Sequence, residues 1–372
     1  MELLLPHDVI EYILERLDVK TLLKFMTVSK QWKSTIIQCR SFQTRQMLRH
    51  KQSGKTHVAF VSLYGGSARN SGIEALRTLA VGSTVSVKIP TTWENKFYEV
   101  CNTSCDGLIC LYNCYDGQCI VVNPTTRCHR TIPPCNYHLA VPFITRIRQP
   151  SPGFGKDKIN GTYKVVWLYN SAELGLKNKS ITTCEVFDFT TNAWRYIVPA
   201  SPYLIHHIQV PLYCDGSLHW LTEGDETNVL SLDLHTETFQ VIPQPPFLHG
   251  LTTPNLIMCS LDDRLCVSPR IWLQQHVMWS FDSEDKTWKK IYSIDLKRTS
   301  SALRDYITPL SVLGKDKLLL YDREFSGVQL VAYDLRTKYY DISYKCNDNA
   351  YKDNNKVVPS DHERLLEAVT GA

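Results

Sequence analysis

The sequence predicts an α+β multidomain protein, with a small N-terminal three-helix unit followed by a large all-β, propeller-like domain. Apolar residues recur at helical spacing only up to about residue 55; beyond it they alternate in short runs separated by polar turns. One strand-and-turn pattern repeats about every 50 residues, a period typical of four-stranded propeller blades. The chain has 372 residues, 43% of them hydrophobic, which is enough for one small module and one large domain.

Three short helices are predicted before residue 40, each from its own start signal. Pro6 is tolerated in a first helical turn and precedes an apolar stripe at helical spacing. Asp18 and Ser29 are suitable N-terminal caps for the second and third helices, because their side-chain oxygens can accept backbone N–H groups. A further short helix is expected over residues 41–50.

The β-region is predicted from a repeated strand–turn–strand unit. In each copy a strand ends in Asn or Asp, whose side chain can accept backbone N–H groups two residues later and so close the turn. The following strand carries an aromatic residue, expected to fill the wedge between neighbouring sheets. An irregular β-sandwich is the alternative fold. The turn residues are Asn123, Asp188, Asp233, Asp282 and Asp334.

A second recurring element is a polar turn that leads into an apolar strand, as in YCDGSLHWLTEG (213–224) and SLDDRLCVSP (260–269). It predicts the inner hairpin of a blade. The stretch PSPGFGKDKING (150–161) is expected to be an exposed loop. The expected domains are the three-helix unit (1–40), a helical linker (41–55), the β-domain (56–344) and a polar C-terminal tail (345–372), which has a helical-looking piece at 360–369.

Composition and charge argue against several classes of function. The formal net charge is only +4, and basic residues concentrate only between Arg40 and Lys55, which favours a solvated helix over a nucleic-acid-binding face. No stretch approaches the roughly 18 uncharged apolar residues of a membrane span. The first residues lack the pattern of a secretory signal, so the thirteen cysteines are expected to be reduced, in the nucleus and/or the cytoplasm.

No catalytic residue, metal site or cofactor is predicted. Seven cysteines crowd one region without the paired spacing of zinc ligands, and those inside apolar strands are expected to pack as small hydrophobes. Composition leaves a Cys/His pair open, but no nucleophile signature, P-loop, GxGxxG or HExxH motif accompanies it. The cysteines are Cys101, Cys105, Cys110, Cys114, Cys119, Cys128 and Cys135, and the histidines are His129, His138, His206, His207 and His219.

The helical unit holds more large apolar side chains than a module of about 40 residues can bury alone, so it is expected to share its core with a partner protein. It resembles an F-box motif, whose pattern runs Leu-Pro-x-Asp, an apolar helix, Leu-Leu and Val-Ser-Lys-x-Trp. Asp18 departs from this pattern where many members carry Pro. The matching residues are Leu5, Pro6, Asp8, Ile10, Ile13, Leu14, Leu17, Leu22, Leu23, Val28, Ser29, Lys30 and Trp32.

The β-region is similar, more loosely, to the F-box-associated domain of a large plant family, related to kelch-type propellers. The resemblance implies a non-catalytic substrate receptor of an SCF-type E3 ubiquitin ligase. Such a receptor docks on a Skp-family adaptor, reaches the cullin-RING core through it, and holds a protein substrate for ubiquitination and proteasomal degradation. The adaptor-binding residues it implies are Leu5, Pro6, Ile10, Ile13, Leu14, Leu17, Leu22, Leu23, Val28 and Trp32.

Two other functions stay open from the sequence. One is a kelch-like scaffold or inhibitor that binds partners without ubiquitination, and the other is an enzyme built on a propeller. The substrate and the residues that bind it are not predicted, because propeller loops vary without a readable code. The tryptophans Trp93, Trp167, Trp220 and Trp272 are expected mostly to pack in the blade cores.

Overall fold

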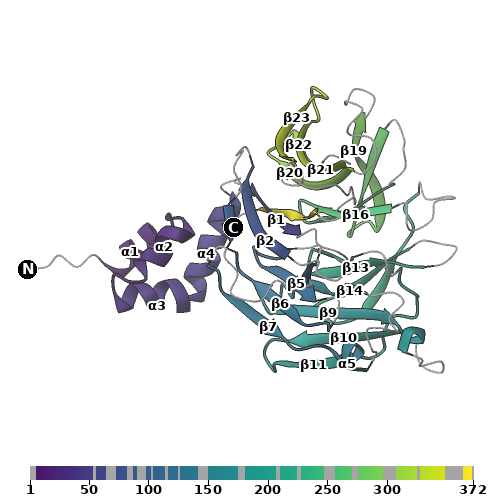
Figure 1. The fold of residues 1–372 in the computed structure, drawn as a ribbon, viewed down its shortest axis with the longest axis horizontal. Coiled ribbons are helices and arrows are strands. Elements are labelled where there is room, and N and C mark those ends of the chain that lie inside the picture. Colours follow the sequence, from purple (N-terminus) through teal and green to yellow (C-terminus); the bar gives the residue numbers. More distant parts are fainter. Residues whose placement is uncertain are drawn as a thin grey trace, which may run out of the picture.

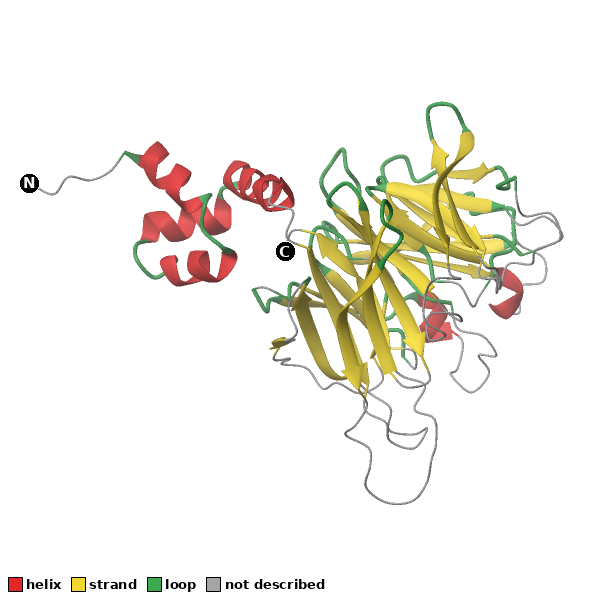
Figure 2. Cartoon of the chain, turned by 90° about the horizontal axis from the view of Figure 1, so that it is seen from above, coloured by secondary structure: helices red, strands yellow, loops and turns green. Residues whose placement is uncertain are grey.

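A group of N-terminal helices precedes a large β-domain in the computed structural model of the chain (Figures 1 and 2). The helices are α1 (His7–Leu14), α2 (Val19–Phe25), α3 (Lys30–Gln38) and α4 (Arg40–Gln52). The structure describes residues 6–52, 56–63, 73–81, 87–89, 98–101, 104–113, 116–124, 126–140, 150–174, 181–206, 210–223, 228–246, 256–269, 275–295, 307–324, 327–347 and 363–370.

The first three helices begin at the predicted signals. Pro6 occupies the N-cap position of α1. The Asp18 side chain accepts the backbone N–H of Thr21 at 3.0 Å, and the Ser29 side chain accepts that of Trp32 at 3.1 Å. Both predicted caps are therefore confirmed.

The helical unit has a small core to which α4 contributes. Leu14 of α1, Leu22 of α2 and Phe42 of α4 are buried in one cluster. Arg45, also on α4, donates to the Glu11 carboxylate of α1 at 2.8 Å. The structure therefore moves the boundary of the helical unit beyond residue 40, because Phe42 closes the core from within the expected linker.

The described β-domain contains six antiparallel sheets of four strands each, which confirms a propeller-like arrangement. Within each sheet, or blade, hydrogen bonds join the strands in the order given. The blades are β24 (Glu363–Thr370), β1 (Thr56–Leu63), β2 (Ile73–Ala80), β3 (Val87–Ile89); β4 (Tyr98–Val100), β5 (Ile109–Asn113), β6 (Cys119–Val122), β7 (His129–Ile132); β8 (Gly153–Lys156), β9 (Tyr163–Asn170), β10 (Thr182–Asp188), β11 (Ala193–Ile197); β12 (Leu212–Cys214), β13 (Ser217–Leu221), β14 (Val229–Asp233), β15 (Phe239–Ile242); β16 (Leu256–Leu261), β17 (Arg264–Pro269), β18 (Gln275–Asp282), β19 (Thr287–Asp295); and β20 (Ile307–Leu313), β21 (Lys317–Glu324), β22 (Gly327–Asp334), β23 (Tyr340–Asn347).

Successive blades face each other across apolar cores. The first strands of neighbouring blades also meet: β12 contacts β8 and β16, and β20 contacts β16 and β24. Trp167 and Trp220 are buried in two of these inter-blade cores, as predicted, whereas Trp93 and Trp272 lie outside the described residues. A helix of one turn, α5 (Asn136–Ala140), and a 3-10 turn (Ser171–Leu174) lie in the connections.

The C-terminal segment differs from its prediction. Residues 363–370 form strand β24, not a helix, and pair with β1 from Thr56↔Thr370 to Ser62↔Glu363. Its apolar residues have helical spacing, but pairing with β1 supplies a first strand for the first blade and joins the two ends of the β-domain. This long-range pairing overrides the local pattern.

The predicted Asn and Asp turns are confirmed, each between the third and fourth strands of a blade. The Asp233 carboxylate accepts the N–H groups of His235 and Thr236 at 2.7 and 2.8 Å, and Asn123 accepts that of Thr126 at 3.0 Å. Asp188, Asp282 and Asp334 make the same kind of contact. Four residues after each turn residue comes a positive φ of 53° to 62°, at Arg127, Asn192, Glu237, Lys286 and Lys338.

Replacing Asp188 by Ala should therefore lower the free energy of unfolding by about 1 kcal/mol, because two residues of the turn lose their side-chain acceptor. Asp188→Asn should cost much less, since Asn123 fills the same position in the second blade. Urea denaturation of the two variants checks this. Equal losses for Ala and Asn would show that the turn does not depend on this acceptor.

The predicted inner hairpins are confirmed at the turns that join first and second strands. Asp215 and Gly216 between β12 and β13 have φ of 44° and 78°, and Asp262 and Asp263 between β16 and β17 have 51° and 59°. Two positive φ values suit the right-handed twist of a tight hairpin.

The propeller has two different faces. Because neighbouring strands run antiparallel, the tight turns between strands one and two and between three and four share one face, called here the tight-turn face. The connections between strands two and three, and from one blade to the next, lie on the opposite, long-connection face. Thr56, where β1 begins, pairs with Thr370 at the tight-turn end of β24. The helical unit therefore joins the propeller on its tight-turn face.

The stretch 150–161 is not the exposed loop that its Pro and Gly residues predict. It contains β8, a buried first strand that packs against the fourth blade. A Cβ atom at Gly153 would lie 2.7 Å from the Leu218 side chain, and one at Gly155 only 2.3 Å from the Tyr213 ring. These glycines allow close packing of two blades and do not mark a loop.

Candidate functional site

The helical unit exposes apolar side chains on α1 and in the turn before α3. Val9 and Ile13, one helical turn apart on α1, are 40% and 42% exposed, and Val28 is 59% exposed. Pro6 is also exposed. Such side chains are the kind that a groove in a partner protein can bury.

The predicted docking residues divide into exposed and buried sets. Pro6, Ile13 and Val28 are open to a partner, whereas Leu14 and Leu22 are buried in the helical core, so they position the helices and do not face outward. Val9 is not among the predicted docking residues, although it lies in the apolar stripe that follows Pro6. Ile10, Leu17 and Trp32 pack partly buried against that core, Leu23 is half-buried, and Leu5 lies outside the described residues.

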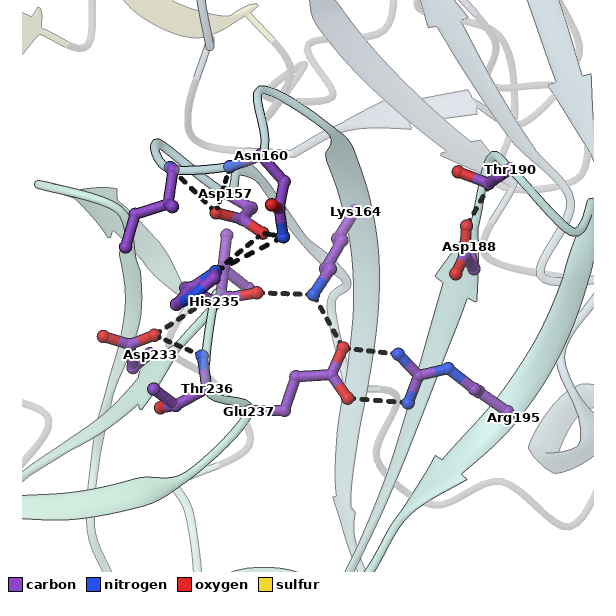
Figure 3. A network of polar contacts seen from close by, with 12 residues as sticks. Asp157, Asn160, Lys164, Asp188, Thr190, Arg195, Asp233, His235, Thr236 and Glu237 are labelled. Carbon is purple, nitrogen blue, oxygen red and sulfur yellow. Dashed lines mark hydrogen bonds and ion pairs between the residues drawn. The ribbon is translucent and has the colours of Figure 1, made fainter.

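A polar network on the tight-turn face joins the third and fourth blades (Figure 3). Arg195 of β11 binds both carboxylate oxygens of Glu237, at 2.5 and 2.6 Å, and Lys164 of β9 donates to the same carboxylate at 2.6 Å. Burial raises the pKa of Glu237, but these hydrogen bonds lower it overall. One carboxylate of the fourth blade thus binds two cations of the third blade, so the network ties the two blades together.

The buried Asp157 in Figure 3 is also a turn residue. It accepts the backbone N–H groups of Ile159 and Asn160 at 2.9 and 3.1 Å, and it lies 3.3 Å from His235 Nδ1. Burial raises its pKa, while the hydrogen bonds from Asn160, His235 and Ile159 lower it overall. This Asp–His contact fixes a turn against the next blade.

Among the described residues, Cys135 and His138 form a contact of the Cys/His kind left open by the sequence. The Cys135 Sγ lies 3.1 Å from His138 Nδ1, and both side chains are buried. Burial raises the pKa of the Cys135 thiol, which keeps it protonated and unreactive. His129 is exposed, His206 and His219 are buried, and His207 lies outside the described residues.

The clustered cysteines pack in the core between the second and third blades, which confirms their predicted role as small hydrophobes. Cys128 is exposed and Cys114 lies outside the described residues. In the part of the chain that the structure describes, no group of three or more His, Cys, Asp or Glu side chains is placed to hold a metal ion. No described helix has the length and apolar character needed to cross a membrane. The buried cysteines of this core are Cys101, Cys105, Cys110, Cys119 and Cys135.

Two buried histidines should make the propeller acid-sensitive. Burial lowers the pKa of His219 and of His276 from 6.5 to about 4. Below pH 6.5 the unfolded chain takes up protons that the folded chain does not, so stability is lost as the pH falls from 6.5 towards 4, by up to about 3 kcal/mol for each histidine. In urea denaturation across this range, His276→Leu should lose less stability than wild type; an identical pH profile would contradict this.

Comparisons with known proteins agree with this architecture. The F-box domain model matches residues 3–44, a range that includes Phe42, and the model described as the F-box associated beta propeller domain matches residues 73–360. "F-box protein At5g10340" from Arabidopsis thaliana is 59% identical, with 93% of this chain and 82% of that protein covered. "F-box protein At2g34280", from the same plant, is 52% identical, with 92% and 94% covered. The chain therefore belongs to the family of plant F-box proteins with an F-box associated beta propeller domain.

Proposed function

We propose that this protein is the substrate-recognition subunit of an SCF-type E3 ubiquitin ligase. The observation that carries the proposal is the exposed apolar face of α1, formed by Val9 and Ile13, on a helical unit that matches an F-box. The F-box domain implies binding to a Skp-like adaptor. The propeller has separate inter-blade cores of its own, so it can hold a second protein while the helices are bound.

The proposed mechanism is positional. The exposed side chains of α1, with Pro6 and Val28, insert into a groove of a Skp-family adaptor, and each apolar side chain that is fully buried contributes roughly 1.5–3 kcal/mol. The adaptor links the chain to a cullin-RING core, whose conjugating enzyme transfers ubiquitin. The chain supplies proximity between a substrate lysine and that enzyme. It carries no catalytic group in this proposal and acts in the nucleus and/or the cytoplasm.

The test is proximity labelling by the full-length chain in plant cells, with and without proteasome inhibition. Adaptor and cullin should be labelled under both conditions, and candidate substrates should accumulate only when the proteasome is inhibited. A scaffold that binds partners without ubiquitination would give the same labelled set in both conditions and no cullin. That result would overturn the proposal.

A further inference from the structure

The connection between the third and fourth blades crosses the long-connection face as a fixed strap, defined here as residues 198–206. It leaves the outermost strand β11 and reaches the blade that begins with β12. The backbone carbonyl of Ser201 accepts a hydrogen bond from Thr182 Oγ1 of β10 at 2.5 Å. Further along, Ile205 exchanges two hydrogen bonds with the Asn170 side chain of β9, at 3.0 and 3.1 Å.

The end of the strap is fixed to the fourth blade. The backbone N–H of His206 donates to the Leu221 carbonyl at 3.0 Å, and the carbonyl of Leu204 accepts the N–H of Glu223 at 2.8 Å. The strap is thus hydrogen-bonded in turn to β10, β9 and β13. Because its backbone is held at several points, it has little conformational entropy left to lose when a ligand binds.

The outward side chains of the strap are apolar and exposed. Val198 is 85% exposed, Tyr203 is 43% and Leu204 is 41%, while Ser201 and Ile205 point inward and are buried. Pro199 and Pro202 are exposed between them. Tyr is among the residues enriched at the anchor positions of protein interfaces, and the exposed aliphatic side chains beside Tyr203 add apolar area that a partner can bury.

The strap also lacks charge. From Tyr196 to His206 the sequence YIVPASPYLIH contains no Asp, Glu, Lys or Arg, and His206 is buried. The nearest preceding cation, Arg195, is bound to both oxygens of Glu237. A charged group docked on the strap would lose water and gain no counter-charge from residues 196–206. The exposed Glu223, whose N–H binds the Leu204 carbonyl, flanks the strap and further disfavours acidic ligands.

We propose that the strap captures an uncharged, apolar segment of the recruited protein. This inference rests on the proposed function, because it assigns the substrate-binding surface of the same receptor. The strap lies on the face opposite the attachment of the helical unit, so a segment bound there leaves α1 free for the adaptor.

The test uses a library of random peptides displayed on phage, selected against the full-length chain. Selected peptides should be uncharged and should carry at least two aliphatic or aromatic residues. Their affinity, measured by fluorescence anisotropy, should fall at least tenfold for Tyr203→Ser/Leu204→Ser. The matched control is Tyr339→Ser/Ile342→Ser, which removes two exposed apolar side chains from the sixth blade and should leave the affinity unchanged.

Selection of charged peptides, or an equal loss of affinity in the control, would overturn the inference. So would strap variants that keep peptide affinity but change self-association in light scattering, since the strap would then bind a second copy of the chain. Adaptor binding, measured in parallel, should be the same for wild type and strap variant. If wild type binds no adaptor, the proposed function fails, while the peptide result still decides what the strap binds.

Discussion

Replacing Val9 and Ile13 together by Ser is expected to abolish useful adaptor binding while the chain stays folded. Both side chains are substantially exposed on one face of α1, so their loss opens no cavity in the helical core. Removing two apolar anchors from an interface should cost about 2–4 kcal/mol, which weakens binding roughly 30- to 1000-fold. Biolayer interferometry against a purified Skp-family adaptor measures the change, and a thermal melt checks the fold.

A matched control tests whether adaptor affinity depends on α1 in particular or falls when any exposed apolar side chain of the helical unit is removed. Leu48→Ser removes an apolar side chain of α4 that is 50% exposed, and it should leave the adaptor affinity within about twofold. Leu14→Ala should behave differently from both, because Leu14 is buried and its truncation should cost about 2–5 kcal/mol of stability in the helical unit. Wild-type affinity in Val9→Ser/Ile13→Ser would show that α1 is not the docking element.

Replacing Glu185 by Ala should destabilise the propeller by about 3–5 kcal/mol, because several hydrogen-bond donors lose their acceptor. Glu185 on β10 is fully buried, and its carboxylate accepts the backbone N–H groups of Asn136 and Tyr137 at 3.0 and 2.9 Å. It also accepts the Asn136 side-chain amide at 2.7 Å and the Tyr169 hydroxyl at 2.9 Å. Alanine would leave four buried or partly buried donors without this acceptor, and the start of α5 without its anchor.

Urea denaturation of the full-length chain measures this loss. Glu223→Ala, which truncates an exposed carboxylate near the strap, is the matched control and should change stability by less than about 0.5 kcal/mol. A midpoint for Glu185→Ala close to that of Glu223→Ala would mean that α5 is held by its apolar contacts, among them the buried Tyr137, and not by this carboxylate.

Features set by neighbouring residues could be predicted from the sequence. The side chain of a cap such as Ser29 accepts the N–H of the third residue after it, and a turn residue such as Asp233 accepts N–H groups two and three residues later. Both features can therefore be recognised from a few consecutive residues of sequence. The aromatic residue after the Asp188 turn was equally informative. Trp194 packs on Phe187 with ring centroids 5.3 Å apart and donates to the Pro133 carbonyl of the preceding blade at 2.8 Å.

Features set by distant residues could not be predicted. Gly153 has the local pattern of a loop residue, and only its contact with Leu218 of the next blade explains it. The strand character of 363–370 depends on β1, at the other end of the β-domain. Leu14 and Ile13 are neighbours in one apolar stripe, but the packing of α2 and α4 buries the first and leaves the second exposed. Burial by tertiary contacts decides which predicted docking residues a partner can reach.

The most direct test of a receptor that links a propeller to a ubiquitin ligase is reconstitution from purified components. The full-length chain is mixed with a Skp-family adaptor, a cullin and its RING subunit, and the mixture is separated by size exclusion with light scattering. We expect one complex that contains each component once, and we expect Val9→Ser/Ile13→Ser to abolish it. A wild-type chain that is folded by thermal melt and elutes alone, while the other three components assemble, would contradict this expectation.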